Sequence, residues 1–266
     1  MPSLLSFSRR KAEKPEAGIR IIFLFTAKGV IILLLCDKLI HLELISYASP
    51  DNRTAKSLKS KGDQNYMKRK AYSAGTVKMS FWFMEFRKVV GLLAEGKSLD
   101  EIKKINQNEN IFAAPTTLRS KQILSTVSGR INMLDESFIE IFQSSDVATQ
   151  KIFALVAAFA YDTLFFDFVY EVLREKMIIG SNTFTDSDVR IFFKDKQLQD
   201  EKVAKWTEAT LNRLGRSYKT MLYEAGFIDK GKTERTIIKP ILDPLMEQWL
   251  KNHGMEACIR ALTGVR

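Results

Sequence analysis

From Met79 onward, apolar residues recur at the three- and four-residue spacing of amphipathic α-helices. The first such stretch spans residues 79–94, and its polar residues fall on the other faces. Ser98 and Glu101 then form a capping-box pattern at the start of a second, short helix. The pattern predicts a mainly helical body. The apolar stripe of the first helix comprises Phe83, Phe86, Val90 and Leu93.

A third helical stretch, 117–134, follows a break at "NENIFAAP", and Thr116 or Thr117 can cap it. No acidic residue occurs between Pro115 and Leu134. A short helix, a break and a helix with a basic polar face is a helix-turn-helix pattern. An ordinary helical hairpin with a solvated face explains the same residues equally well. The candidate DNA contacts on this helix are Arg119, Lys121, Gln122, Ser125 and Arg130.

Residues 136–176 are the most apolar part of the body and include "IFALVAAFAYDTLFFDFVYEVL". A helix that is apolar almost all round is typical of the centre of a helical core. Asp162, Asp167 and Glu171 interrupt the stretch, which argues against a membrane span. A metal site is not expected from these acids, because Asp162 and Asp167 would lie about 140° apart around a helix.

Further helices are predicted between residues 185 and 226. Thr185 can cap the first, a short helix "DEKVAKW" follows, and Thr207 can cap a long one. At 100° per residue, the long helix has one apolar face and one polar, basic face. Its apolar face comprises Leu211, Leu214, Tyr218, Met221 and Leu222.

A small basic hairpin is predicted directly after the long helix. Gly226 suits the left-handed residue that ends a helix, and Phe227-Ile228 and 236–238 have strand composition. Between them, residues 229–232 have turn chemistry, with Gly231 free to take a positive φ. Helix, helix, recognition helix and wing is the order of a winged helix-turn-helix, a fold that also serves in protein recognition. The candidate DNA contacts of this block are Asn212, Arg213, Arg216, Lys219, Thr220, Lys230, Lys232 and Arg235.

After Pro240, one or two closing helices are expected, with Leu245, Trp249 and Cys258 packed inward. We therefore expect an all-α fold with a small β-wing. The regions are an N-terminal extension (1–66), a helical domain with the helix-turn-helix-like pair (67–135), central core helices (136–178) and the winged-helix-like block (180–266).

The extension contains an apolar run, Ile19–Cys36, interrupted by Arg20 and Lys28. Each charge opposes membrane insertion by roughly 2.5–3.5 kcal/mol at a helix centre. We favour a translation start at Met67, in "GDQNYMKRKAYSAG", so that the native protein would lack residues 1–66. A membrane-associated segment and a soluble helix packed on the body are the alternatives.

The composition favours a polyanionic partner, because 41 basic and 31 acidic residues give a net charge of +10. The two cysteines and two histidines have no metal-ligand spacing, and the cysteines suit a reducing cytoplasm. No phosphate loop, GxSxG, HExxH or CxxC motif is present. The sequence indicates neither an enzyme nor a cofactor, metal or small-molecule substrate.

From Met67 to Arg266, the sequence resembles the BrxA family of BREX bacteriophage-exclusion systems. The resemblance is carried by "MKRKAYSAG", "APTTLRS", "FALVAAFAYDTLFFDFVYEVLREK" and "TEATLNRLGRSYKTMLYEAGFI". It implies a helical protein similar to NusB-type antitermination factors, with DNA-binding ability and no catalytic motif. It also implies other BREX proteins, such as the methyltransferase, as partners.

Three functional hypotheses follow. The first is a non-enzymatic accessory protein that binds double-stranded DNA through basic helix faces and the wing. The second is a protein-interaction scaffold without direct DNA binding, and the third is RNA binding of the antitermination type. A membrane location is expected only if residues 19–36 are translated.

Overall fold

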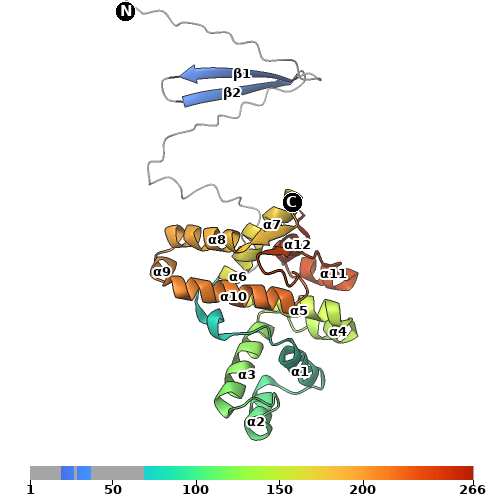
Figure 1. The fold of residues 1–266 in the computed structure, drawn as a ribbon. Coiled ribbons are helices and arrows are strands. Elements are labelled where there is room, and N and C mark those ends of the chain that lie inside the picture. Colours follow the sequence, from blue (N-terminus) through green and yellow to red (C-terminus); the bar gives the residue numbers. More distant parts are fainter. Residues whose placement is uncertain (1–18, 27–28, 37–68, 266) are drawn as a thin grey trace, which may run out of the picture. The chain divides into compact units, whose positions relative to one another are not determined.

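A computed structural model describes residues 19–26, 29–36 and 69–265 of the chain. The chain divides into two compact units, Met1–Ser60 and Lys61–Arg266. The described part of the second unit is mainly helical and contains two short strands, which confirms the expected all-α class with a small β element (Figure 1).

In the first unit, strands β1 (Ile19–Thr26) and β2 (Gly29–Cys36) form an antiparallel hairpin that pairs Ile19 with Cys36. The alternative interpretation of this apolar run as a helix was wrong. The run is rich in β-branched and aromatic residues, which favour extended backbone. The predicted start at Met67 concerns residues outside the described part of the chain and stays a prediction.

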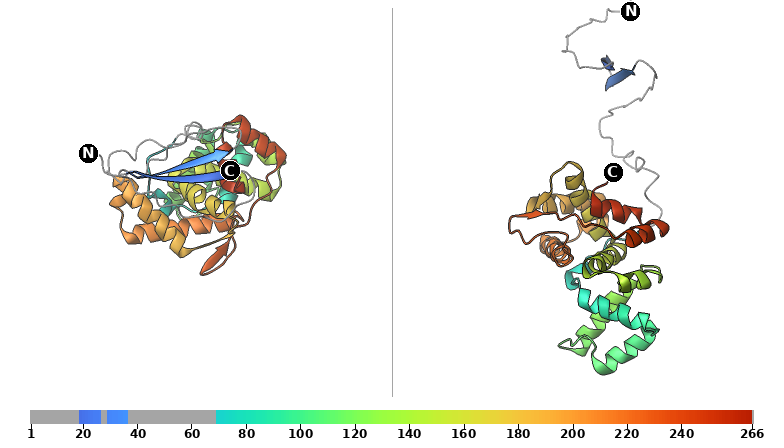
Figure 2. Two further views of the ribbon diagram at one scale, coloured as in Figure 1. Left: turned by 90° about the horizontal axis from the view of Figure 1, so that it is seen from above. Right: turned by 90° about the vertical axis from the view of Figure 1, so that its right-hand side faces the viewer.

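Three helices form one end of the second unit, as the side view in Figure 2 shows. The expected caps are confirmed: Ser98 and Glu101 cap one another's backbone in a capping box, and Thr116 accepts from the Arg119 N–H at 3.1 Å. The first helix begins four residues later than expected, because the backbone is extended at Met79, after a 3-10 turn (Gly75–Lys78), and left-handed at Trp82. The helices are α1 (Phe83–Ala94), α2 (Leu99–Glu109) and α3 (Thr117–Ile131).

The central apolar stretch is broken at Asp162, whose carboxylate accepts from the Leu164 and Phe165 N–H groups at 3.0 and 3.2 Å. Among the described residues, no single helix is long and apolar enough to cross a membrane. Val147–Tyr161 and Thr163–Ile178 meet that criterion only together, and they bend by 112°. The elements are α4 (Phe138–Ser144), α5 (Val147–Tyr161), α6 (Thr163–Phe168), a π-helical turn (Val169–Leu173) and α7 (Arg174–Ile178).

The C-terminal block follows the predicted order. Trp249 and Cys258 are buried as expected, whereas Leu245 is 62% exposed because it lies on the outer face of its helix. The expected inward packing of Leu245 was therefore wrong. The elements are β3 (Thr183–Thr185), α8 (Asp186–Gln199), α9 (Glu201–Ala204), α10 (Glu208–Glu224), β4 (Glu234–Thr236), α11 (Pro244–Asn252) and α12 (Glu256–Thr263).

The buried ring of Tyr218 anchors α10 to the central helices. It stacks on Phe165 with ring centroids 4.7 Å apart and on Phe168 at 5.8 Å. Burial of these rings supplies both apolar area and specific aromatic contacts. The opposite face of α10 is consequently held toward solvent in a fixed orientation.

Candidate nucleic-acid interface

Helix α10 has the two faces that its sequence predicts. Thr207 caps the helix by accepting from the Thr210 N–H at 3.3 Å. The five predicted apolar residues are all buried. On the other face, the exposed residues are Asn212, Arg213, Arg216 and Thr220.

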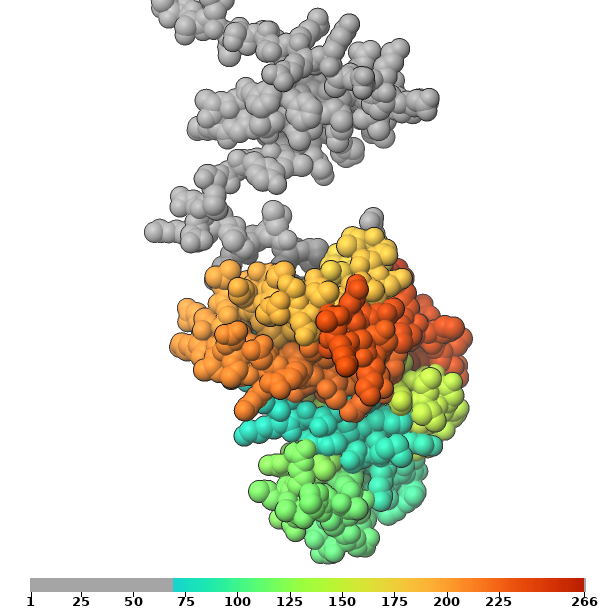
Figure 3. Space-filling model, viewed as in Figure 1, coloured from blue at the N-terminus to red at the C-terminus, as the bar shows by residue number. Residues whose placement is uncertain are grey.

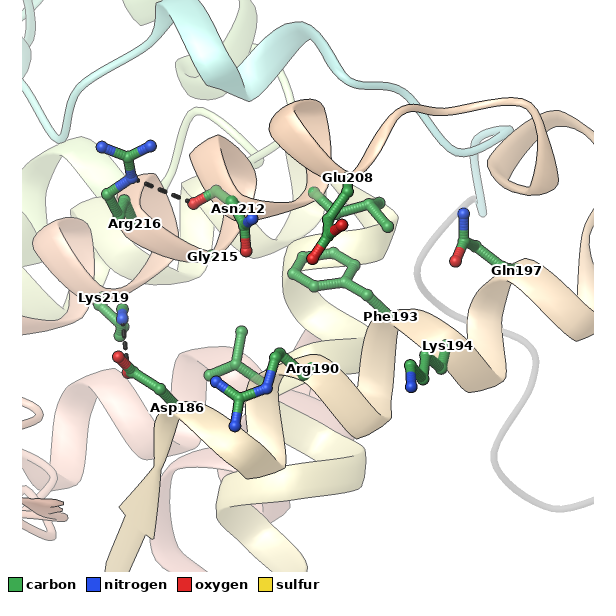
Figure 4. Close-up of a pocket in the computed structure, with 12 residues that line it drawn as sticks. Asp186, Arg190, Phe193, Lys194, Gln197, Glu208, Asn212, Gly215, Arg216 and Lys219 are labelled. Atoms are coloured by element: carbon green, nitrogen blue, oxygen red, sulfur yellow. Dashed lines mark hydrogen bonds and ion pairs between the residues drawn. The ribbon is translucent and has the colours of Figure 1, made fainter. Parts of the chain in front are cut away.

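A hollow of about 610 Å³ lies between α8 and α10. The helices meet closely at Gly215, where a Cβ atom would lie 2.8 Å from a methyl carbon of Val189. Figure 4 shows Arg190 and Lys194 on α8 across the hollow from Arg216 on α10. This hollow therefore brings cations from two helices onto one surface.

The sequence analysis missed Arg190 and Lys194, although their four-residue spacing places both on one side of α8. The stripe of Val189, Phe192 and Phe193 packs inward. A helical projection of α8, like the one made for α10, would therefore have placed Arg190 and Lys194 on the outer face of the helix. The hollow is not wholly basic, since Asp186 and Glu208 also line it.

Two of the predicted contacts are neutralised within the protein. The Lys219 Nζ and Arg235 Nη1 atoms lie 2.6 and 2.9 Å from the same oxygen of Asp186. Partial burial raises the pKa of Asp186, but the hydrogen bonds and charges of the two cations outweigh it and hold that pKa below its usual value. Lys219 and Arg235 thus tie α10 and the hairpin to the start of α8.

Several other cations keep their charge uncompensated. Within residues 69–265, no ion pair forms at the exposed cations of α8, α10 and the hairpin turn. These residues are Arg190, Lys194, Arg213, Arg216, Lys230 and Lys232. The charges of these six cations are therefore not neutralised by an ion pair within the described residues.

The hairpin after α10 contributes one strand to a two-stranded sheet and also forms one isolated bridge. Strand β4 pairs with β3, and Ile237 forms an isolated bridge with Ile228. The Asp229 carboxylate closes the turn by accepting from the Gly231 and Thr236 N–H groups at 3.1 and 2.9 Å. These bonds hold the turn that carries Lys230 and Lys232.

Gly226 has φ 80°, which confirms its predicted left-handed conformation. Gly231, which was free to take a positive φ, does not take one. Glycine is required there for space instead, because a Cβ atom at Gly231 would lie 1.7 Å from the Glu234 carbonyl oxygen.

On α3, the structure separates the predicted contacts into two groups. Lys121, Gln122 and Ser125 are exposed and Arg119 is half-buried. Arg130 is only 2% exposed, and it donates to the Phe81 and Ser80 carbonyl oxygens at 2.6 and 3.0 Å. Burial lowers the pKa of Arg130 to about 10. The assignment of Arg130 as a DNA contact was therefore wrong, since the segment before α1 covers it.

The polar faces of α3 and α10 meet at a second hollow, of about 490 Å³. Arg119 and Gln122 of α3 line it together with Arg216 and Thr220 of α10. Arg216 also lines the hollow between α8 and α10, so the two hollows share one residue. Four residues predicted from separate helices thus line one hollow.

The three central acids have structural partners. Asp167 accepts from Arg69 and Tyr72, each at 2.6 Å, while Glu171 pairs with Lys196 at 2.7 Å. Asp162 caps α6 and also accepts from Thr76. Among the described residues, no group of three or more metal-ligating side chains is placed to hold a metal ion.

Comparison with known proteins gives a family and a fold. A family model described as BrxA matches residues 70–254. "BREX protein BrxA" of Bacillus cereus (strain H3081.97) is 36% identical over 177 residues, which cover 66% of this chain and 88% of that protein. The protein of the same name from Paramagnetospirillum magneticum (strain ATCC 700264 / AMB-1) is 24% identical over 67% of this chain and 89% of its own length.

One solved structure shares the fold at 20% sequence identity. It is the crystal structure of an uncharacterized protein from Magnetospirillum magneticum, with a TM-score of 0.63 over 73% of this chain and 99% of the other. The match of the family model, together with the 36% identity to the Bacillus protein, shows that this chain belongs to the BrxA family.

Proposed function

We propose that this protein binds double-stranded DNA as a non-catalytic accessory component of a BREX phage-exclusion system, acting in the cytoplasm. The supporting observation is the surface formed by α10, α8 and the hairpin, where six exposed cations have no ion-pair partner within residues 69–265. The names of its relatives support the placement in a BREX system.

The order of elements supports the DNA proposal. α7, β3, α8, α10 and the β4 hairpin follow one another as the helices and strands of a winged helix do. In such a module, the exposed face of α10 would enter the major groove, which admits an α-helix. Lys230 and Lys232 would then reach phosphates of the flanking backbone, where contacts position the protein without reading sequence.

Fluorescence anisotropy with a duplex, across salt concentrations, tests the proposal. Arg213→Glu with Arg216→Glu should weaken binding at least ~100-fold, because each phosphate contact to a cation contributes about 1.5–3 kcal/mol. The slope of log affinity against log salt should become shallower by about 0.9 for each phosphate that the variant no longer neutralises. Lys103→Glu with Lys104→Glu, on the exposed face of α2, is the matched control and should reduce affinity far less.

Duplex affinity that is equal in the Arg213/Arg216 variant and in wild type would contradict the proposal. A structured RNA competitor separates the RNA hypothesis from the DNA proposal. If RNA displaces the duplex at equal concentration, the antitermination-type function is favoured.

One observation favours the scaffold hypothesis as a second candidate. Ile241 is 98% exposed and lines a hollow of about 770 Å³ together with Val147, which is 49% exposed. An exposed apolar surface of this kind is typical of protein contacts. Co-purification with the BREX methyltransferase that is lost in Ile241→Asp, without any duplex affinity of the wild type, would support the scaffold.

A further inference from the structure

The hollow where α3 meets α10 has a lining without any acidic residue. We call this hollow the junction cradle, and its cations are Lys78, Arg119 and Arg216. They come from three different elements: the 3-10 turn before α1, helix α3 and helix α10. In Figure 3, the segment before α1 lies between the surfaces of α3 and α10. The remaining lining residues are Val77, Met79, Ser80, Gln122, Ser217 and Thr220.

The side chain of Arg119 is held in place within the cradle. Its guanidinium carbon lies 4.9 Å from the centre of the Trp82 ring, and Nη1 donates to the Lys78 carbonyl oxygen at 3.5 Å. A cation over the face of a tryptophan ring is attracted by the ring's quadrupole. Because these contacts leave the charge of Arg119 uncompensated, they orient the guanidinium without neutralising it.

Trp82 itself has an unusual backbone. Its φ of 53° and ψ of 47° lie in the left-handed region, which is disfavoured for a bulky side chain. Such a conformation costs about 1–3 kcal/mol and persists where surrounding contacts fix it, often beside a ligand. Here it accompanies the stacking of the Trp82 ring on Arg119.

Arg130 holds in place the segment before α1, which forms one wall of the junction cradle. By donating to the Ser80 and Phe81 carbonyl oxygens, it joins the segment before α1 to α3. Its Nη2 atom also lies 3.6 Å from the Met221 sulfur of α10. Arg130 is thus a positioning residue, which acts on the cradle through the backbone of residues 80 and 81.

We propose that the junction cradle binds a phosphate group, and that this phosphate belongs to the backbone of the duplex that lies on α10. The assignment to duplex DNA rests on the proposed function, whereas the phosphate chemistry rests on the cradle alone. Arginine guanidinium groups match phosphate oxygens in a bidentate geometry. Three like charges around one hollow repel one another, and a bound anion offsets that repulsion.

The proposal changes the expected footprint of the protein on DNA. With α10 and the hairpin alone, only the C-terminal block would contact the duplex. With the cradle occupied, Arg119 and Gln122 place α3 on the same phosphate backbone. The two sets of predicted contacts, on α3 and on α10, then form one continuous interface.

The test uses the full chain and a cradle variant, Arg119→Gln with Lys78→Gln. Lys103→Gln with Lys104→Gln removes the same charge from the exposed face of α2 and is the matched control. Inorganic tripolyphosphate, measured by isothermal titration, probes phosphate binding without DNA. A labelled duplex, measured by anisotropy, probes the complete interface, and circular dichroism confirms that each variant is folded.

Wild type should bind one tripolyphosphate, and the cradle variant should bind it ~10-fold more weakly, as expected for the loss of about 1.4 kcal/mol. Duplex affinity should fall by a similar factor, with a salt slope shallower by about one. The control should behave as wild type toward tripolyphosphate. Lys78→Gln alone, which changes an exposed side chain, should show the same trend even if the double variant fails to fold.

These measurements distinguish failure of the cradle proposal from failure of the proposed function. If the cradle variant binds both probes as wild type does, while Arg213→Glu with Arg216→Glu loses the duplex, the cradle is rejected and the proposed function stands. If tripolyphosphate binding depends on Arg119 but the duplex does not bind, the phosphate site is supported and its assignment to DNA is overturned. If wild type binds neither probe, both proposals are overturned.

Discussion

Lys219 of α10 lies with its Nζ atom 2.6 Å from the Asp186 carboxylate at the start of α8. Arg235 of the hairpin shares that carboxylate at 2.9 Å. A single acid therefore joins three elements of the C-terminal block, α8, α10 and the hairpin, and pairs with two of the block's cations. The same acid stabilises the fold and reduces the positive charge available to a polyanion.

Asp186→Asn should separate these two effects. Because Asp186 is 48% exposed, its ion pairs are screened by solvent, and we expect a loss of only about 0.5–1 kcal/mol in the free energy of unfolding. Duplex affinity should rise several-fold, since Lys219 and Arg235 would become available to phosphates. Urea unfolding and anisotropy measure the two changes.

Glu109→Gln, an exposed change on α2, is the charge-matched control and should raise affinity only slightly. Equal affinity of Asp186→Asn and Glu109→Gln would show that Lys219 and Arg235 do not reach the duplex even when released.

Arg130→Met should destabilise the protein by about 2–4 kcal/mol in urea unfolding. The substitution leaves the Phe81 and Ser80 carbonyl oxygens without their donor, and each unsatisfied buried group costs about 1–3 kcal/mol. The salt slope of duplex binding should change by less than that of the Arg213 and Arg216 variant. An Arg130→Met protein as stable as wild type would contradict the structural role of Arg130.

Arg130 also shows where prediction from the sequence ends. Helical periodicity placed it beside the polar face of α3, and the cap at Thr116 and the helix itself are confirmed. Periodicity does not reveal what packs on a helix, and here the backbone of residues 80 and 81 covers Arg130. An arginine at the boundary between the polar and apolar faces of a helix can donate its hydrogen bonds to buried carbonyl oxygens as well as to a ligand.

The ion pairs of Lys219 and Arg235 with Asp186 could not be predicted from the sequence, for a related reason. Asp186 is 33 residues from Lys219 and 49 from Arg235, so only the folded block brings them together. By contrast, the faces of α10 follow from local spacing alone and were predicted residue by residue. The run at 19–36 was ambiguous, since a short apolar stretch fits a strand or a helix.

Asp146→Asn should make the stability of the protein depend less steeply on pH in the acidic range. Asp146 accepts from the Thr149 N–H at 2.7 Å at the start of α5, and this hydrogen bond holds the pKa of the carboxylate below its usual value. The stability it adds is complete above the unfolded pKa of about 3.9 and is lost as pH falls through the lower folded pKa. Asparagine also caps helices but does not titrate.

The measurement is the Tm of wild type and Asp146→Asn between about pH 2 and 7. Near neutral pH the two should differ little, and below the unfolded pKa the wild type should lose more of its Tm than the variant. Parallel curves would mean that the charge of Asp146 contributes nothing to the cap.

Gly231→Ala should disturb the hairpin turn, because the added Cβ would lie 1.7 Å from the Glu234 carbonyl oxygen. The backbone must move to relieve this contact, which breaks the bonds from Gly231 and Thr236 to Asp229 and displaces Lys230 and Lys232. We expect duplex affinity to fall several-fold while the helical content by circular dichroism is unchanged.

Gly91→Ala, inside α1, is the matched control, since the nearest neighbour of its added Cβ atom would lie 4.0 Å away. That control should stabilise the helix by about 0.5–1 kcal/mol and leave duplex affinity as in wild type.

If Gly231→Ala displaces the turn but leaves duplex affinity unchanged, the hairpin does not contact the duplex.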